Sequence, residues 1–174
     1  MSAAPTSIHA SAVKVGDQAV LIRGPSGSGK SRLAFGLIVA GRSGQVAKAE
    51  LIADDRVLLE RRSGAVLART VPELAGLIEI RGLGIRRCPH VDHAPIGLVV
   101  DLWAADAARM PAPEALRVSV EGVELPRIPV GEGFDPLAMV VAFLITTDSV
   151  SGGTQLDDCR KENGNHISHS IVSE

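Results

Sequence analysis

Residues 24–31 read GPSGSGKS and decide the fold, because they match the pattern G-x-x-x-x-G-K-[ST] of a phosphate-binding P-loop. The run QAVLIR at 18–23 precedes them and predicts a short buried strand. The segment that starts at Lys30 has the apolar spacing of a helix, with Gly41 as its expected end. Strand, loop and helix in this order favour a P-loop over the alternative, an ordinary glycine-rich turn.

The residue types of this loop suit a nucleoside triphosphate. Its glycines let backbone N–H groups approach the β-phosphate without Cβ clashes, and the helix N-terminus adds a positive dipole. We expect the Lys30 ammonium to bridge the β- and γ-phosphates and the Ser31 hydroxyl to ligate Mg²⁺. The chain has no N-K-x-D guanine-reading signature, which disfavours a GTPase. We therefore predict ATP and Mg²⁺ as cofactors, bound by Gly24, Pro25, Ser26, Gly27, Ser28, Gly29, Lys30 and Ser31.

Two adjacent carboxylates, Asp54 and Asp55, follow a second apolar strand predicted at 50–53. In a P-loop sheet, carboxylates at this position hold Mg²⁺ through water or act as a general base. Because successive side chains of an extended strand point in opposite directions, we expect the two to have different roles. The alternative interpretation is a solvated acidic turn.

The rest of the chain predicts a mixed α/β fold. A final helix is expected to begin at Asp135-Pro136, with Asp135 as N-cap, and to end near residue 145. The P-loop is expected near the centre of a mixed sheet flanked by helices. Residues 1–148 form the expected catalytic domain, and residues 149–174, which are polar, the expected flexible tail. Further strands are predicted at 57–59, 65–68, 77–80, 96–102, 118–120 and 123–125, and short irregular or helical pieces at 104–109 and 113–116.

Composition excludes several classes of function. The net charge is −2 and only four residues are aromatic, with no tyrosine, so neither a basic surface nor base stacking favours nucleic acid as a partner. The longest apolar run, 137–145, is about half of the ~20 residues that a membrane span needs. Two lone cysteines, Cys88 and Cys159, and an N-terminus without a signal-peptide pattern predict a cytoplasmic protein.

Four segments resemble the catalytic domain of bacterial HPr kinase/phosphorylase. They are SIH at 7–9, the P-loop, LIADDRV at 51–57 and IEIRGLGI at 78–85, and the last of these is the most specific. The resemblance runs from about Ile8 to Ile145. Since the N-terminal domain of the family has no counterpart, the chain resembles a short version that carries only the catalytic domain.

This resemblance implies a fold, an activity and partners. The implied fold is a P-loop core related to that of phosphoenolpyruvate carboxykinases, commonly assembled as a homo-hexamer. The implied activity is ATP-dependent phosphorylation of a serine on HPr, the small phosphocarrier of the phosphotransferase system, or on a nitrogen-branch relative. Many members of the family also reverse this reaction by phosphorolysis.

The resemblance also assigns roles to residues. The implied catalytic residues are His9, Lys30, Asp54 as the general base, Asp55 beside it, and Arg109. The implied magnesium ligands are Ser31, Glu79 and Asp55. Where the family has P-V-R-P-G-R-N, this chain reads PVGEGFD at 129–135, so both arginines are lost and Glu132 adds a negative charge. Because phosphorolysis brings two anions together, this loss predicts a weak reverse reaction.

Other interpretations remain open at this point. The chain is alternatively a nucleotide-sensing binding module or a small-molecule kinase, although His9, Asp54 and Glu79 together favour chemistry over sensing. The loop CPHVDH at 88–93 is either a polar loop or a metal site. The basic cluster of Arg81, Arg86 and Arg87 is either a solvated face or a contact for nucleotide phosphates or a protein substrate.

Overall fold

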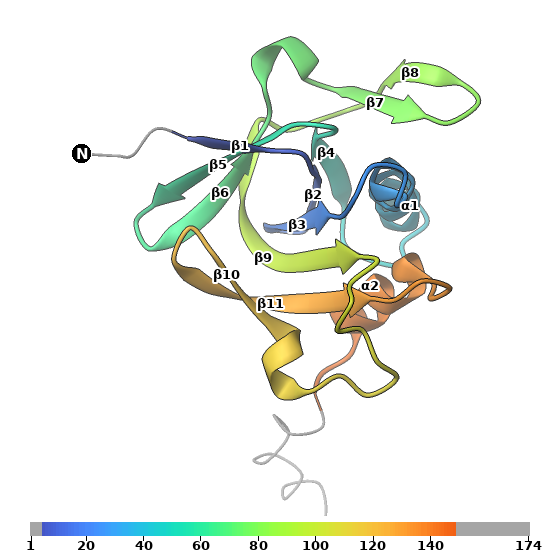
Figure 1. Cartoon of the computed structure of the whole chain (residues 1–174). Coiled ribbons are helices and arrows are strands. Elements are labelled where there is room, and N and C mark those ends of the chain that lie inside the picture. The colour runs from blue at the N-terminus through green and yellow to red at the C-terminus, as the bar shows by residue number, and fades with distance from the viewer. Residues whose placement is uncertain (1–4, 149–174) are drawn as a thin grey trace, which may run out of the picture.

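Nine strands form one curled sheet in the computed structural model of the chain, which describes residues 5–148 (Figure 1). The order is β1-β5-β6-β9-β3-β2-β4, and β11 joins the edge of β9 and carries β10. A separate two-stranded sheet, β7-β8, projects from it. The main-sheet strands are β1 (Thr6–Ile8), β2 (Ser11–Val15), β3 (Gln18–Arg23), β4 (Ala49–Ala53), β5 (Val57–Arg62), β6 (Ala65–Arg69), β9 (His93–Leu102), β10 (Arg117–Val120) and β11 (Val123–Val130); the hairpin strands are β7 (Leu77–Ile80) and β8 (Gly84–Arg87).

The long strand β9 determines the shape of the sheet. Its first residues pair antiparallel with β6, whereas its last residues run parallel to β3 on one side and to β11 on the other. The sheet is therefore mixed, as predicted. Parallel pairing also brings the carboxyl ends of β3, β9 and β11 to one edge, where Arg23 lies opposite Asp101 and Val130 opposite Leu102.

The two α-helices within residues 5–148 lie on one face of the sheet. Helix α1 (Lys30–Arg42) and helix α2 (Pro136–Ile145) contact each other and cover a core that includes Val20, Ile22 and Val100. Helix α2 begins as its sequence predicts, since the Asp135 side chain accepts hydrogen bonds from the backbone N–H groups of Leu137 and Ala138, at 3.0 and 3.3 Å. Two short 3₁₀ helices, η1 (Pro72–Leu74) and η2 (Pro113–Leu116), lie in connections.

The opposite face is covered by strands, which corrects the expectation of a sheet flanked by helices. Leu21 points away from the Val20–Ile22 side and packs in a second core with Ile52, Val57 and Val66. Strands β5 and β6 form a tight hairpin through Ser63-Gly64, so their connection leaves no chain for a helix. The curl of the sheet buries this second face instead.

The predicted elements are confirmed with a few differences at their ends. Strand β9 begins at His93, three residues before the predicted start, and β11 continues to Val130 instead of ending at 125. Residues 104–109 contain no helix, and the glycine-spaced exit from β7 returns as strand β8. The predicted tail at 149–174 lies outside the described residues. Within residues 5–148, no helix is long and apolar enough to cross a membrane.

Candidate active site at the glycine-rich loop

The glycine-rich loop joins β3 to α1, and Lys30 is the first residue of the helix. Its side chain is only 7% exposed, and its Nζ donates hydrogen bonds to the carbonyl oxygens of Gly24 and Pro25, both at 3.0 Å. Burial lowers the pKa of the Lys30 ammonium, while the nearby charges of Asp54 and Asp55 act in the opposite direction. The loop thus folds back over its own lysine, and both carboxylates lie close enough to affect that charge.

A buried hydroxyl in this loop fits an anionic ligand. The Ser28 Oγ atom is buried and has no hydrogen-bond partner among the described residues. An unsatisfied buried polar group costs about 1–3 kcal/mol, which a phosphate oxygen would offset by accepting the hydrogen bond. Gly24 makes this packing possible, because a Cβ at that position would lie 2.7 Å from Ser28 Oγ and 3.0 Å from Leu102 Cβ. Ser28 and Lys30 therefore suit a phosphate group.

Asp54, at the end of β4, joins three parts of the chain. It is 6% exposed, and its Oδ1 accepts hydrogen bonds from the hydroxyls of Ser11 at 2.6 Å and Ser31 at 2.9 Å. Its Oδ2 accepts a third hydrogen bond, at 3.1 Å, from the backbone N–H of Glu79. One carboxylate thus links β2, the start of α1 and the β7 segment.

Asp55 faces the other way, but not by the strand alternation on which the sequence prediction relied, because β4 ends at Ala53. Its side chain is exposed, its backbone is left-handed with a φ of +67°, and its Oδ1 lies 3.1 Å from Nδ1 of His9. The same His9 nitrogen lies 3.1 Å from the Asp55 carbonyl oxygen. The two carboxylates therefore have different surroundings: Asp54 is buried among hydroxyl donors, whereas Asp55 forms an exposed pair with an imidazole.

The remaining predicted residues are only partly brought together. Glu79 is held at the site by its backbone, and its side chain is exposed. Arg109 is exposed in the segment between β9 and η2, and no hydrogen bond or ion pair with residues 5–148 connects it to the site. No three His, Cys, Asp or Glu side chains within that range are arranged to hold a metal ion, neither here nor in the loop at 88–93. A magnesium ion would therefore depend on phosphate oxygens and water as well as on protein ligands.

Two features of the site could not be identified from the sequence. One is Ser11, a fully buried hydroxyl whose only sequence signal is a polar residue within an apolar strand. The other is a network beside the loop, in which Arg23 donates to both oxygens of Asp101 at 2.7 and 2.8 Å. Arg127 donates to Asp101 at 2.5 Å and to Asp106 at 2.6 Å. Although burial raises the pKa of Asp101, the two guanidinium groups hold it below its usual value.

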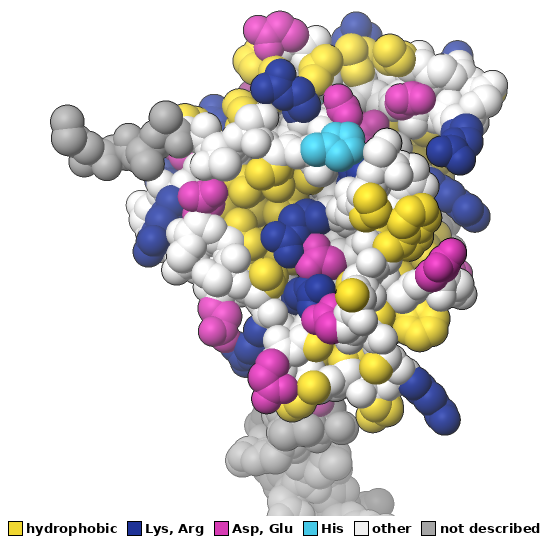
Figure 2. Space-filling model, viewed as in Figure 1, with side chains coloured by type: hydrophobic (Ala, Val, Ile, Leu, Met, Phe, Trp, Pro, Cys, Tyr) yellow, Lys and Arg dark blue, Asp and Glu magenta, His cyan; other side chains and the backbone are white. Residues whose placement is uncertain are grey.

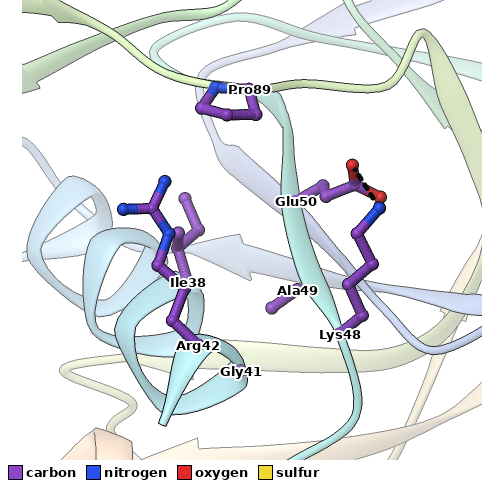
Figure 3. Close-up of a pocket in the computed structure, with 7 residues that line it drawn as sticks. All are labelled: Ile38, Gly41, Arg42, Lys48, Ala49, Glu50 and Pro89. Atoms are coloured by element: carbon purple, nitrogen blue, oxygen red, sulfur yellow. Dashed lines mark ion pairs between the residues drawn. The ribbon is translucent and has the colours of Figure 1, made fainter.

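Acidic and basic side chains are mixed over the face shown in Figure 2, and no continuous basic stripe crosses it. A separate small pocket lies at the far end of α1, between that end and β4 (Figure 3). Its volume is about 150 Å³, and the Lys48–Glu50 ion pair, at 3.0 Å, lies along one side. Small-molecule sites usually measure about 300–1,000 Å³, so this pocket is not a second candidate site.

Comparisons with known proteins agree with the sequence resemblance. The family model described as "HPr Serine kinase C-terminal domain" matches residues 1–140. The HPr kinase/phosphorylase of Geobacillus thermodenitrificans is 35% identical over 149 residues, which cover 78% of this chain and 46% of that protein. The enzyme of the same name from Mycoplasma mycoides is 36% identical over 101 residues, or 54% of this chain and 30% of that protein. The chain thus spans less than half the length of these curated relatives.

A solved structure resembles the fold. The Hpr(Ser) kinase/phosphatase from Coxiella burnetii matches with a TM-score of 0.63 and covers 80% of this chain and 93% of that one. The sequence identity is 22%, so this likeness concerns the mixed sheet with few helices and not the site. The family match over residues 1–140 shows that the chain belongs to the HPr serine kinase C-terminal domain family.

Proposed function

We propose that this chain is an ATP-dependent protein serine kinase of the HPr kinase type, acting in the cytoplasm on HPr or a nitrogen-branch relative. The observation that carries the proposal is the hydrogen bond between Asp54 and Ser31, because it connects the candidate base to the last residue of the GPSGSGKS motif. The family match supports the same activity. Residues 1–148 form the proposed catalytic domain, with a core of the phosphoenolpyruvate carboxykinase type.

In this proposal each site residue has one task. The loop N–H groups and the Lys30 ammonium bind the phosphates and stabilise the charge that develops during transfer. Asp54 accepts the proton of the acceptor serine at Oδ2, the oxygen that carries only one hydrogen bond. Ser31, Glu79 and Asp55 would hold Mg²⁺, which neutralises phosphate charge when it is bound with ATP.

One observation favours a second assignment of the base. Asp55 is exposed and paired with His9, whereas Asp54 is buried and bonded to the proposed magnesium ligand Ser31. An exposed carboxylate–imidazole pair is also suited to accept a proton from a protein hydroxyl. The roles of Asp54 and Asp55 would then be exchanged, without any change in the overall reaction.

We also propose that the chain self-associates. Helix α2 has the sequence PLAMVVAFLI, yet Val140 is its only fully buried residue. Phe143, Leu144 and Ile145 are exposed, and a helix without charged residues is normally covered on all sides. This apolar surface supports the homo-oligomer, a hexamer, that the family resemblance implies.

The reverse reaction should be weak. Glu132 and Asp135 are exposed in the segment after β11, where the family pattern has two arginines. At an effective dielectric constant of about 20, a carboxylate ~6 Å from a bound phosphate opposes phosphate binding by about 3 kcal/mol before screening by salt. Even a third of that cost, left after screening, should slow the phosphorolysis step several-fold.

Transfer of label from ATP tests this function. Purified chain is incubated with γ-labelled ATP, Mg²⁺ and either HPr or its nitrogen-branch relative, and the labelled residue is identified by mass spectrometry. Label on a carrier serine supports the kinase, and the same assay with phosphorylated carrier and inorganic phosphate measures pyrophosphate release. Nucleotide binding without transfer would instead identify a sensor, and label on a metabolite a small-molecule kinase.

A further inference from the structure

Trp103, the only tryptophan of the chain, has an unusual backbone and an unusual environment. Its φ is +57°, in the left-handed region, which costs a residue with a side chain about 1–2 kcal/mol. Its side chain is also 51% exposed, so its large apolar surface contributes little to the core. A strained residue that gains little packing is typical of a binding site.

The neighbours of Trp103 fix it beside the glycine-rich loop. Leu102, before it, lies against the first residue of the loop, since a Cβ on Gly24 would be 3.0 Å from Leu102 Cβ and 3.1 Å from its carbonyl oxygen. Ala104, after it, donates its backbone N–H to the carbonyl of Val130 at the end of β11, at 2.9 Å. Trp103 is thus held between the loop and the end of β11.

This position is at the edge where β3, β9 and β11 all end in parallel, and where open α/β sheets bind their ligands. The groups suited to phosphate, Ser28 and Lys30, lie in the adjacent loop. A nucleotide whose phosphates lie there must place its base beyond the loop. An exposed indole is the side chain best suited to stack on a flat aromatic base.

We propose that Trp103 is the platform on which the purine base of the nucleotide stacks. The inference rests on the proposed function, because it requires a nucleotide in the loop. It assigns recognition of the base to the turn after β9, separately from recognition of the phosphates by the loop. Stacking uses the face of the base and not its edges, so the platform contributes affinity for any purine nucleotide.

Because the chain has one tryptophan, its fluorescence reports on Trp103 alone. ADP should quench Trp103 fluorescence, whereas inorganic tripolyphosphate, which has phosphates but no base, should quench it far less. By calorimetry, Trp103→Leu should weaken ADP binding about tenfold, within the range expected for loss of one stacked base, and leave tripolyphosphate binding within twofold. Trp103→Phe, which keeps a ring, should bind ADP within about threefold of wild type.

Phe35→Leu provides a matched control, because Phe35 is an exposed aromatic residue on α1 to which no role is assigned. This variant should bind both ligands as wild type does, and melting temperatures of all variants report on folding. Wild-type ADP affinity in Trp103→Leu would overturn the proposal, as would an equal loss of affinity for ADP and tripolyphosphate. If the wild type binds tripolyphosphate but not ADP, base stacking on Trp103 is refuted, whereas phosphate binding by the loop is not. Binding of neither would refute the proposed function as well.

Discussion

Replacing Ser11 with alanine tests whether the buried carboxylate of Asp54 must be oriented for phosphoryl transfer. The Ser11 hydroxyl is fully buried and donates to Asp54 Oδ1 at 2.6 Å. Alanine removes this donor and leaves Asp54 with two, the Ser31 hydroxyl and the Glu79 N–H. Because Ser11 has no access to solvent, water cannot easily replace the lost hydrogen bond.

The contacts of Asp54 set the expected magnitude. A hydrogen bond to a charged group contributes about 1.5–3 kcal/mol, and the two remaining donors compensate for part of the loss. We therefore expect Ser11→Ala to lower the free energy of unfolding by about 1–2 kcal/mol, or the melting temperature by about 3–6 °C. If the hydrogen bond stabilises the transition state by about 1.4 kcal/mol more than the enzyme–substrate complex, its loss lowers kcat about tenfold. The KM for ATP should change little, because Ser11 lies outside the glycine-rich loop.

Steady-state kinetics with the carrier protein, together with thermal unfolding, measure both effects. Ser11→Cys keeps a donor, although a weaker one on a somewhat larger side chain, so it should show intermediate values. Ser7→Ala is the matched control, since its hydroxyl is exposed and accepts a hydrogen bond from Arg56, at 3.2 Å. A Ser11→Ala protein with wild-type kcat and melting temperature would refute the orienting role. A raised KM for ATP with unchanged kcat would place the effect in the loop instead.

Further substitutions test the other proposed roles. Asp54→Asn should abolish phosphoryl transfer and keep nucleotide affinity within about an order of magnitude. Asp55→Asn should mainly raise the Mg²⁺ concentration that activity requires. If Asp55→Asn abolishes transfer and Asp54→Asn changes the Mg²⁺ requirement, Asp55 is the base. Glu79→Gln and Ser31→Ala should each raise the Mg²⁺ concentration that gives half-maximal activity, and unchanged titrations would remove both from the metal site. Ile145→Glu should reduce the molar mass measured by light scattering, and an unchanged mass would show that the exposed end of α2 is not the subunit interface.

The glycine-rich loop and the start of α2 could be predicted from the sequence, because interactions between residues close in the chain determine them. The loop between β3 and α1 requires left-handed backbone at Gly27 and Gly29, with φ of +80° and +97°, and glycine adopts it without strain. Helix α2 begins where Asp135 and Pro136 predict, since the carboxylate caps N–H groups two and three residues away. These contacts connect residues that are close in the chain.

The remaining features depend on partners far apart in the chain. Ser11 and Asp54 are separated by 43 residues, and Arg23 and Asp101 by 78. No local pattern indicates that these side chains meet, because strand order decides it. Strand β11 also continues past its predicted end because it changes partners, pairing with β10 up to Pro126 and with β9 from Arg127 onward. On the side away from β9 the later residues form an edge, where Pro129 is tolerated.

The same long-range contacts support the proposal that forward transfer is faster than its reversal. Arg23 ends β3, and Arg127 lies in β11 three residues before the strand ends at Val130, within the segment that has lost the two family arginines. Both are bound to Asp101, and Arg127 also to Asp106, so two positive charges face two negative ones and little charge remains for a free phosphate. In the proposed function, binding of nucleotide phosphates should not depend on this network, because it would use loop N–H groups and Lys30. Under the proposed function, Arg23 and Arg127 are therefore already neutralised and should contribute little to holding inorganic phosphate beside a phosphoserine.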